Sequence, residues 1–329
     1  MRVLFIGGSG VISSACSELA IARGFELTLL NRGNSERPIP PGARLIQTDI
    51  RQKGSVERAL EGLTFDAVVD WIAYETPHIE ADIQLFQGRT GQYIFISSAS
   101  AYQKPPTILP ITESTPLDNP FWAYSRAKIA CEERLMKAFQ GDKFPITIIR
   151  PSHTYDQTLL PVHGGYTTIN RMRKGKKVVI HGDGASLWTL THHKDFAIGL
   201  IGLIGNPHAI GQAFHITSDE WLTWDQIHSI LANSANCEIH AVHVPSEIIA
   251  AYDAEWGASL LGDKAHCGIF DNAKIKRVVP EFNPSIPFTQ GAKEIISWYD
   301  KDLSRQLIDS HFDSLMDQII QAQERTFLQ

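Results

Sequence analysis

The sequence predicts an α/β protein with a Rossmann-like, doubly wound parallel sheet and a smaller mixed α/β lobe. Short apolar runs alternate with helix-like segments through the first half of the chain, as in parallel strands joined by crossover helices. A glycine-rich turn separates the first apolar run from the first helical pattern, which is typical of dinucleotide binding. We assign residues 1–155 to the dinucleotide-binding domain and 156–329 to the second lobe, with about 190–217 returning to the sheet.

Each predicted element rests on a local pattern. The first strand, helix and second strand are predicted at Val3 to Ile6, Val11 to Arg23 and Leu27 to Leu30. Further strand-like runs cover residues 43–49, 66–73, 92–98 and 145–151, and later helices are predicted at 224–235, 288–302 and 305–325. In the last helix, apolar residues recur at helical spacing, so we expect one face to be buried on the body of the protein or on a partner, and we favour packing on the core. These residues are Leu307, Ile308, Phe312, Leu315, Met316, Ile319 and Ile320.

The composition indicates a globular protein and argues against nucleic-acid-binding and membrane proteins. The chain has 329 residues, of which 43% are hydrophobic and 20% charged, as in an ordinary globular protein. Its net charge of −6 provides no general attraction to nucleic acid or to an anionic membrane. We expect the basic run from Asn170 to Val179 to be a solvated face. No apolar stretch approaches the roughly 20 residues that cross a bilayer, and the N-terminus runs straight into a strand, so we expect a cytoplasmic protein.

The four cysteines are scattered along the chain and form no Cys-x-x-Cys pair: Cys16, Cys131, Cys237 and Cys267. This pattern indicates neither a disulfide framework nor a zinc site and suits a reducing compartment. The histidines also lack the spacing of a metal site on one element, so we expect no bound metal.

The glycine-rich turn predicts how a dinucleotide binds. Gly7 permits the tight turn, and Gly10 lets the backbone approach the pyrophosphate, whose charge meets the amides and dipole at the helix start. Ser13 stands at the third position, where a glycine usually allows close packing of helix on strand. At the end of the second strand stands Asn31, followed by Arg32. An acidic residue there would repel a 2′-phosphate and an arginine can bind one, so we favour NADP over NAD.

Tyr124 and Lys128 lie four residues apart at the head of an amphipathic pattern. If the segment is helical, both side chains point into the same space. An ammonium beside a phenol favours the phenolate, so we expect Lys128 to lower the pKa of Tyr124, as proton-transfer catalysis requires. A surface tyrosine packed on a lysine stem would show the same spacing.

The order of these motifs resembles that of the extended short-chain dehydrogenase/reductase family, which contains sugar-nucleotide epimerases and dehydratases. "GGSGVIS" resembles its glycine motif, "TDI" its adenine-contacting turn, "DWIA" a motif beside the cofactor, and "FISSASAY" its serine strand. "YSRAK" matches its Tyr-x-x-x-Lys, and "RPSHTY" resembles its Arg-Pro segment beside the nicotinamide. The resemblance implies that Tyr124 is the acid/base, that Lys128 assists it and holds the ribose, and that Ser98 binds the substrate oxygen. It implies that the cofactor contacts Gly7, Gly10, Val11, Ile12, Asn31, Arg32, Asp49, Ile50, Ala73, Tyr124, Lys128 and Pro151.

Departures from the family pattern bear on the substrate. Family 4,6-dehydratases have Asp-Glu after the catalytic hydroxyl residue, whereas Ala99 and Ser100 follow Ser98 here, which argues against dehydration. Trp188 replaces an arginine that binds the substrate diphosphate in many members, and a neutral ring cannot bind phosphate bidentately. The substrate is therefore expected to be an unactivated sugar, another small polyol or a ketone. Trp188 either stacks on it or packs in the core. The expected substrate contacts are Ser100, His153 and Trp188.

Three functions follow from the resemblance. The first is an NAD(P)-dependent epimerase or reductase acting on a sugar, nucleotide sugar or similar carbinol or ketone. The second is a cofactor-binding regulator without catalysis, against which the intact Ser98, Tyr124 and Lys128 argue. The third is RNA binding, as in chloroplast stem-loop-binding relatives, against which the acidic net charge argues. We expect a small sugar-like substrate and no membrane or nucleic-acid partner, and a homodimer is compatible with the sequence. Substrate identity and the choice between epimerase and reductase stay open.

Overall fold

The computed structural model describes residues 1–35 and 37–326. Its central feature is a sheet in which, within those residues, seven strands pair in parallel throughout. The predicted doubly wound parallel sheet is confirmed. The strands in spatial order are β11 (Gln212–Ile216), β6 (Ile146–Pro151), β5 (Tyr93–Ile96), β4 (Ala67–Asp70), β1 (Arg2–Ile6), β2 (Glu26–Asn31) and β3 (Arg44–Gln47).

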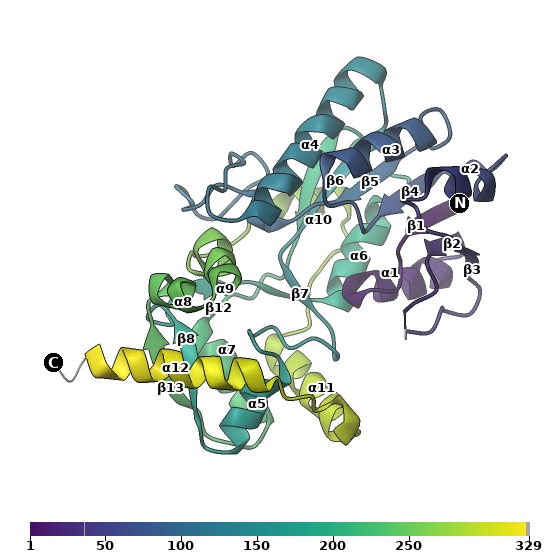
Figure 1. The fold of residues 1–329 in the computed structure, drawn as a ribbon. Helices are drawn as coiled ribbons and strands as arrows, with labels where there is room; N and C mark the ends of the chain where they lie inside the picture. Colours follow the sequence, from purple (N-terminus) through teal and green to yellow (C-terminus); the bar gives the residue numbers. More distant parts are fainter. Residues whose placement is uncertain (36, 327–329) are drawn as a thin grey trace.

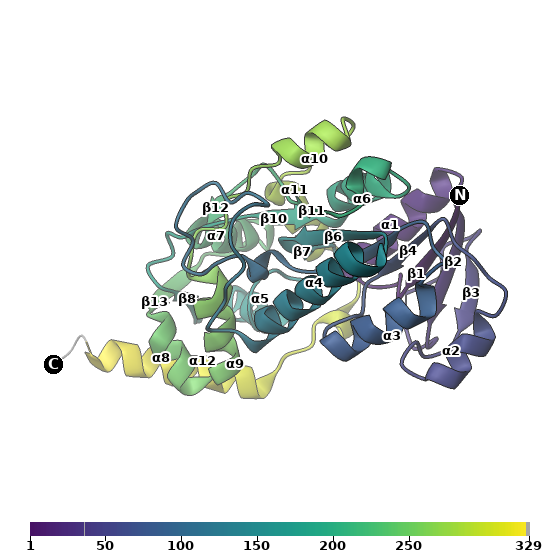
Figure 2. The same cartoon turned by 90° about the horizontal axis from the view of Figure 1, so that it is seen from above.

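Alternate residues of each strand point to opposite faces of the sheet, and both faces are buried. Val3 and Phe5 of β1 pack in one apolar cluster, and Leu4 and Ile6 pack in another. The first cluster is covered by α1 (Val11–Ala22), α6 (His193–Leu203) and α10 (Ala273–Val278). The second is covered by α2 (Lys53–Ala59), α3 (Thr76–Phe86) and α4 (Ala123–Asp142). Figure 2 shows the two groups of helices on opposite sides of the sheet.

A third apolar cluster lies in the second half of the chain, beside the sheet (Figure 1). Its short strands pair as β7 with β10, β8 with β13 and β9 with β12. These strands are β7 (His153–Tyr155), β8 (Lys177–His181), β9 (Leu187–Trp188), β10 (Leu190–His192), β12 (Leu222–Thr223) and β13 (His240–Val244). The helices are α5 (Tyr166–Arg173), α7 (Trp224–Ser234), α8 (Ser246–Tyr252), α9 (Ala254–Ser259), the π-helical turn η3 (Leu260–Lys264), α11 (Phe288–Asp300) and α12 (Ser310–Thr326).

Short 3₁₀ turns complete the chain: η1 (Ala99–Ala101), η2 (Pro207–Ala209) and η4 (Leu303–Arg305). β11 and α6 come from the second half of the chain yet pack with the sheet, at its β6 edge and on one of its faces. Among residues 1–35 and 37–326, no helix is both long and apolar enough to span a bilayer.

The last helix begins later than predicted. Asp309 accepts a hydrogen bond from the Phe312 backbone N–H at 3.0 Å and caps the helix, which starts at Ser310. Leu307 and Ile308 therefore precede the helix, with 77% and 49% of their surface exposed. The prediction that these two residues join the buried face was wrong. The other members of the predicted stripe are buried, namely Phe312, Leu315, Met316, Ile319 and Ile320.

The basic run from Asn170 to Val179 is not wholly a solvated face. Arg171 is only 1% exposed, and its guanidinium donates to Asp313 and Asp317 of α12, each at 2.5 Å. Lys176 also contacts Asp313 at 3.1 Å. These ion pairs hold α12 along β8 and β13, where Figure 1 draws it in yellow.

Candidate active site

The carboxyl ends of the central strands open onto a cavity of about 800 Å³, the place where open α/β sheets bind ligands. Its walls come from the glycine-rich turn, the end of β2, the turn after β3 and the start of α4. Of the residues predicted to contact the cofactor, all but Ala73 line this cavity: Gly7, Gly10, Val11, Ile12, Asn31, Arg32, Asp49, Ile50, Tyr124, Lys128 and Pro151.

The glycine-rich turn is shaped to admit an anion. Gly8 has φ of +88°, a backbone conformation that favours glycine, and a β-carbon there would lie 2.7 Å from Leu29 Cδ2. Ser13 stabilises this turn, because its Oγ accepts a hydrogen bond from the Gly10 N–H at 2.7 Å. Ser17 donates to the Gly8 carbonyl at 2.8 Å. The turn thus presents backbone and the positive end of the α1 dipole to the cavity, which fits a pyrophosphate.

The end of β2 carries an amide and a cation. Asn31 Oδ1 accepts a hydrogen bond from the Gly33 N–H at 2.8 Å, which holds the chain in a tight turn. Arg32 is exposed, lines the cavity, and is anchored through its carbonyl, which accepts from Gln47 Nε2 at 3.2 Å. This end of the cavity lining therefore provides a guanidinium.

Tyr124 and Lys128 share one face of α4, as their spacing predicts, but the pKa of Tyr124 differs from the prediction. Lys128 Nζ donates to the carbonyl oxygens of Ala73 and Ile96 at 2.7 and 2.8 Å and lies 5.8 Å from the centre of the Tyr124 ring. Burial raises the pKa of Tyr124 to about 12, although a hydrogen bond with Ser98 acts in the opposite direction. Burial also lowers the pKa of Lys128 to about 8. The prediction that Lys128 lowers the pKa of Tyr124 was therefore wrong, because the pKa is raised.

Ala73 takes a different place from the one predicted. It is fully buried and does not line the cavity, and its carbonyl serves as an acceptor for Lys128. Its backbone N–H donates to Asp70 Oδ1 at 2.9 Å. Both the N–H and the carbonyl of Ala73 are therefore hydrogen-bonded in the turn after β4. Ala73 therefore positions the lysine.

Three serine hydroxyls form a chain beside Tyr124. Ser98 Oγ lies 2.9 Å from Ser100 Oγ and accepts a hydrogen bond from the Ser100 N–H at 3.2 Å. Ser125 Oγ donates to Ser100 Oγ at 2.8 Å. Ser100 was predicted to contact substrate. It lines the neighbouring cavity but is only 2% exposed, and its polar atoms are engaged with these two serines and with Asn119.

A second cavity, of about 390 Å³, adjoins the first and shares Ser98 and Tyr124 with it. His153 and Trp188, both predicted to contact substrate, line this cavity. Trp188 Nε1 donates to His153 Nδ1 at 3.2 Å, and burial lowers the pKa of His153 to about 3, so the imidazole is neutral. Trp188 is 4% exposed and its ring centre lies 5.6 Å from that of Trp224. Trp188 is therefore both a core residue and part of the cavity wall.

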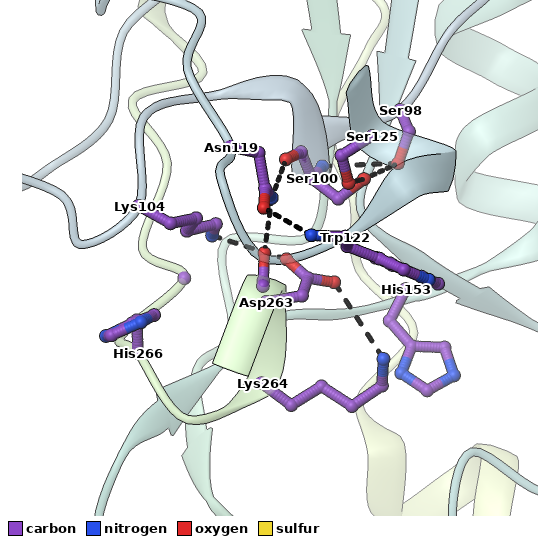
Figure 3. Close-up of polar contacts among 12 residues, drawn as sticks. Ser98, Ser100, Lys104, Asn119, Trp122, Ser125, His153, Asp263, Lys264 and His266 are labelled. Atoms are coloured by element: carbon purple, nitrogen blue, oxygen red, sulfur yellow. Dashed lines mark hydrogen bonds and ion pairs between the residues drawn. The ribbon is translucent and has the colours of Figure 1, made fainter. Parts of the chain in front are cut away.

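Several polar residues in the loops around these cavities, or in their walls, were not predicted from the sequence. Arg37 reaches Asp156 Oδ2 at 2.5 Å, joining the loop after β2 to the loop after β7. Asp263 and Lys264 line the second cavity, and the buried Lys104 lies 3.3 Å from Asp263. Figure 3 shows Lys104 and Lys264 reaching the Asp263 carboxylate from two sides. No local motif marks these residues, because their partners are distant in sequence.

His192 and His163 of the second lobe have structural contacts. His192 Nε2 lies 3.1 Å from Glu294 Oε2, and His163 stacks on Trp256 with ring centres 4.4 Å apart. In the part of the chain that the structure describes, no three His, Cys, Asp or Glu side chains gather as metal ligands would.

The cavity pair, the glycine turn and the parallel sheet agree with a comparison of the whole sequence against known families. The model of the "NAD dependent epimerase/dehydratase family" matches residues 3–86 and 84–216. The chain belongs to this family. The resemblance inferred from motifs and the expected class of nicotinamide-dependent enzyme are confirmed.

Two named relatives resemble this chain at low identity. The 2'-dehydrokanamycin reductase of Streptomyces kanamyceticus is 24% identical over 294 residues, which cover 86% of this chain and 80% of that protein. The chloroplast stem-loop binding protein of 41 kDa b from Arabidopsis thaliana is 28% identical over 240 residues, or 68% of this chain and 60% of that protein.

Solved structures of an epimerase and a dehydratase share the fold. The UDP-glucose 4-epimerase of Bifidobacterium longum, in complex with NAD+ and UDP, superposes with a TM-score of 0.74 at 18% identity. That match covers 93% of this chain and 100% of the epimerase. The dTDP-glucose 4,6-dehydratase of Bacillus anthracis, in complex with NAD, has a TM-score of 0.73 at 16% identity and covers 92% and 98% of the two chains. At these identities the similarity establishes the architecture.

Proposed function

We propose that this chain is an NAD(P)-dependent epimerase or reductase that acts on a sugar, nucleotide sugar or similar carbinol or ketone. One observation carries the proposal: Ser98 and Tyr124 line both cavities, while Lys128 lines the larger one beside them. A nicotinamide in the larger cavity and a substrate in the smaller would therefore meet at these side chains. When bound, the cofactor accepts a hydride from, or donates one to, the substrate carbon.

The chain's own residues would position the substrate and manage its proton. Tyr124 holds its proton firmly, because burial raises its pKa to about 12, and it would donate that proton to a carbonyl oxygen during reduction. That transfer leaves a phenolate, which is also the base that takes the hydroxyl proton in the reverse direction, and Lys128 would stabilise it through its ammonium. Ser98 would donate a hydrogen bond to the same substrate oxygen and hold it beside Tyr124.

We further propose that the cofactor is NADP. The support is the pair Asn31 and Arg32 at the end of β2, where an amide replaces the acidic residue typical of NAD binding. Asn31 uses its oxygen within the turn, so it places no negative charge near a 2′-phosphate. Arg32 supplies a guanidinium that can bind phosphate through charge-assisted hydrogen bonds.

The nature of the retained cofactor separates an epimerase from a reductase. An epimerase returns the hydride to its substrate and can keep its cofactor through many turnovers, whereas a reductase must exchange it. The experiment is to denature the purified protein and identify any released nicotinamide dinucleotide by chromatography. Stoichiometric oxidised cofactor supports the epimerase. Release of none, together with saturable NADPH binding, supports the reductase, and failure of either dinucleotide to bind contradicts both.

RNA binding is the second candidate, because the Arabidopsis relative is named as a stem-loop binding protein. The net charge of −6 argues against it. A filter-binding titration of a stem-loop RNA at 50 and 200 mM salt tests the alternative. Micromolar or tighter affinity that falls steeply with salt would favour RNA binding, and its absence would favour the enzyme.

A further inference from the structure

Asp70 is a fully buried carboxyl group at the carboxyl end of β4, behind the wall of the larger cavity. A buried carboxylate is costly unless hydrogen bonds compensate for its lost hydration. Asp70 Oδ1 accepts two such bonds, from the Ile72 N–H at 2.7 Å and from the Ala73 N–H at 2.9 Å. This carboxyl therefore fixes the turn that follows β4, although the proposed chemistry assigns it no part.

Arg51 holds the same turn by its carbonyl side. Arg51 Nη2 donates to the Ile72 carbonyl at 2.9 Å and lies 3.8 Å from Asp70 Oδ2. The Arg51 backbone N–H donates to Asp49 Oδ1 at 2.9 Å, so the arginine is itself anchored in the turn after β3. The N–H groups of the turn after β4 are thus bound by Asp70, and one of its carbonyls is bound by Arg51.

This turn presents a carbonyl to Lys128. The ammonium has three protons, and two of them are donated to the Ala73 and Ile96 carbonyls at 2.7 and 2.8 Å. Because Lys128 also lines the larger cavity, its third proton is left for a ligand there. Ala73 is therefore the single residue that connects the Asp70 carboxyl to the Lys128 ammonium, through its N–H on one side and its carbonyl on the other.

The charge of Asp70 also acts on the ammonium. Lys128 is only 1% exposed, and burial lowers its pKa, whereas the negative charges of Asp70 and Glu132 act in the opposite direction. Glu132 is already paired closely with Arg150, at 2.6 Å. Asp70 has a looser partner, because Arg51 Nη2 lies 3.8 Å from its Oδ2. Asp70 is therefore a carboxylate whose charge Arg51 and Lys128 share.

Several other titratable groups beside Asp70 and Lys128 are neutral near pH 7. Burial and the charge of Asp70 raise the pKa of Asp82 well above its usual range, so the negative charge of these two carboxyls resides on Asp70. Burial lowers the pKa of His78 and raises that of Cys131 to about 11. The rings around the ammonium carry no net charge, and their centres lie 4.7, 4.8 and 5.8 Å from Lys128 Nζ: Tyr74, Phe95 and Tyr124.

We propose that Asp70 is a positioning residue for Lys128, because its Oδ1 fixes the turn that presents the Ala73 carbonyl and its charge supports the buried ammonium. The inference rests on the proposed function only for the use that the enzyme makes of this ammonium. Asp70 has two separable roles in it. The first is a tether, which needs an acceptor oxygen, and the second is electrostatic, which needs the negative charge.

An NMR titration of the lysine side chains tests the electrostatic role without cofactor or turnover. The protein is labelled with ¹³C at lysine Cε, and the Lys128 signal is identified by its loss in Lys128→Met. Asp70→Asn keeps an acceptor oxygen for the two N–H groups but removes the charge, so the Lys128 midpoint should fall by about one pH unit. The control is Asp66→Asn, at an exposed aspartate just before the same strand, and it should leave the midpoint unchanged. An unchanged midpoint in Asp70→Asn would overturn the electrostatic role.

NADPH binding at pH 6 and pH 8, followed by fluorescence, tests the tether. With the Lys128 midpoint lowered from about 8 by one unit, about half of the ammonium remains in wild type at pH 8 and about a tenth in Asp70→Asn. Asp70→Asn should therefore bind NADPH about three- to fivefold more weakly than wild type at pH 8 and equally at pH 6. Asp70→Ala also loses the acceptor oxygen and should bind more weakly at both pH values. If Asp70→Ala behaves as Asp70→Asn does, the tether through Ala73 is wrong.

The NMR titration separates this proposal from the proposed function, because it needs no cofactor. A lower Lys128 midpoint in Asp70→Asn, with no NADPH binding by wild type, would retain the role of Asp70 and contradict the proposed function. An unchanged midpoint, with NADPH binding that weakens in Lys128→Met, would retain the cofactor site and overturn the electrostatic role of Asp70.

Discussion

Ser100 is hydrogen-bonded to Ser98 twice, because their hydroxyl oxygens lie 2.9 Å apart and the Ser100 N–H donates to Ser98 Oγ at 3.2 Å. Ser125 donates its proton to Ser100 Oγ at 2.8 Å, which leaves the Ser100 proton for Ser98. With both acceptor sites of Ser98 occupied, its own proton is directed outward, toward Tyr124 and the substrate side. Ser100 is therefore a positioning residue for Ser98.

Removing the Ser100 hydroxyl should slow turnover without affecting cofactor binding. We expect Ser100→Ala to lower kcat about three- to tenfold, the value of one neutral hydrogen bond, and Ser100→Thr to restore most of the rate. Cofactor affinity measured by calorimetry should match wild type in both. A Ser100→Ala enzyme with wild-type kcat would show that Ser98 does not depend on this contact.

Tyr124→Phe should abolish most of the turnover and leave cofactor affinity nearly unchanged, because it deletes only the ionisable oxygen. General acid–base catalysis contributes about 10²- to 10⁴-fold, so kcat should fall by that factor. Steady-state kinetics and a cofactor titration on the same preparation provide the measurement. Retention of more than a few per cent of kcat would remove Tyr124 from the chemistry.

Lys128 should make stability depend on pH above about 8. Burial lowers its pKa from 10.5 to about 8, so the folded state disfavours the ammonium. The unfolded chain therefore binds more protons between about pH 8 and 10.5, and stability rises with pH in that window, by at most about 1.4 kcal/mol per unit. Urea unfolding of wild type and Lys128→Met at pH 7, 8.5 and 10 isolates this contribution. If the difference between the two proteins is constant with pH, the lysine is not buried as described.

Arg32→Ala should weaken NADP binding and leave NAD binding unchanged, because only NADP carries the 2′-phosphate. A charge-assisted hydrogen bond contributes roughly 1.5 to 3 kcal/mol, so the loss should be about ten- to a hundredfold. Arg44→Ala, at an exposed arginine on the neighbouring β3, is the matched control. Asn31→Asp should favour NAD by repelling the phosphate. If wild type prefers NAD and Arg32→Ala changes neither affinity, the proposed NADP specificity is contradicted.

The Arg150–Glu132 pair should be a large contributor to stability. Arg150 Nη2 lies 2.6 Å from Glu132 Oε2, and the two side chains are only 6% and 3% exposed. Glu132→Ala leaves a buried guanidinium unpaired and should cost about 3 to 5 kcal/mol in the free energy of unfolding. The control is Glu80→Ala, which breaks an exposed pair with Arg134 on the same α4 and should cost less than about 1 kcal/mol. If Glu132→Ala and Glu80→Ala lose the same free energy of unfolding in urea titrations, the buried pair is no more important than the exposed one.

Local patterns were sufficient to predict the sheet and much of the cavity lining. The runs of apolar residues predicted β1, β2 and β6 because strands buried on both faces consist of nearly continuous apolar runs. Helical periodicity placed Tyr124 and Lys128 on one face of α4, and the glycine turn was recognised because its conformation depends on glycine itself. These features depend on residues close together in sequence.

Other features depend on contacts between distant segments. Lys128 donates to the carbonyls of Ala73 and Ile96, which are 55 and 32 residues away. Burial by distant segments raises the pKa of Tyr124, so the spacing within α4 could not reveal that shift. The cap at Asp309, by contrast, is local, because an aspartate three residues before Phe312 is itself a signal for the start of a helix.

The sequence by itself determined which family the chain resembles, which strands form its sheet and which side chains gather beside a dinucleotide turn. Tertiary structure alone decided that Arg171 is buried against α12, that Trp188 donates to His153, and that Lys264 stands at the junction of two cavities. The physical reason is that burial and charge pairing are properties of a site assembled from several segments. A lysine in "GDK" has the same local sequence whether it faces solvent or a cavity, and only packing of η3 against Trp122 and Asn119 places it in the cavity wall.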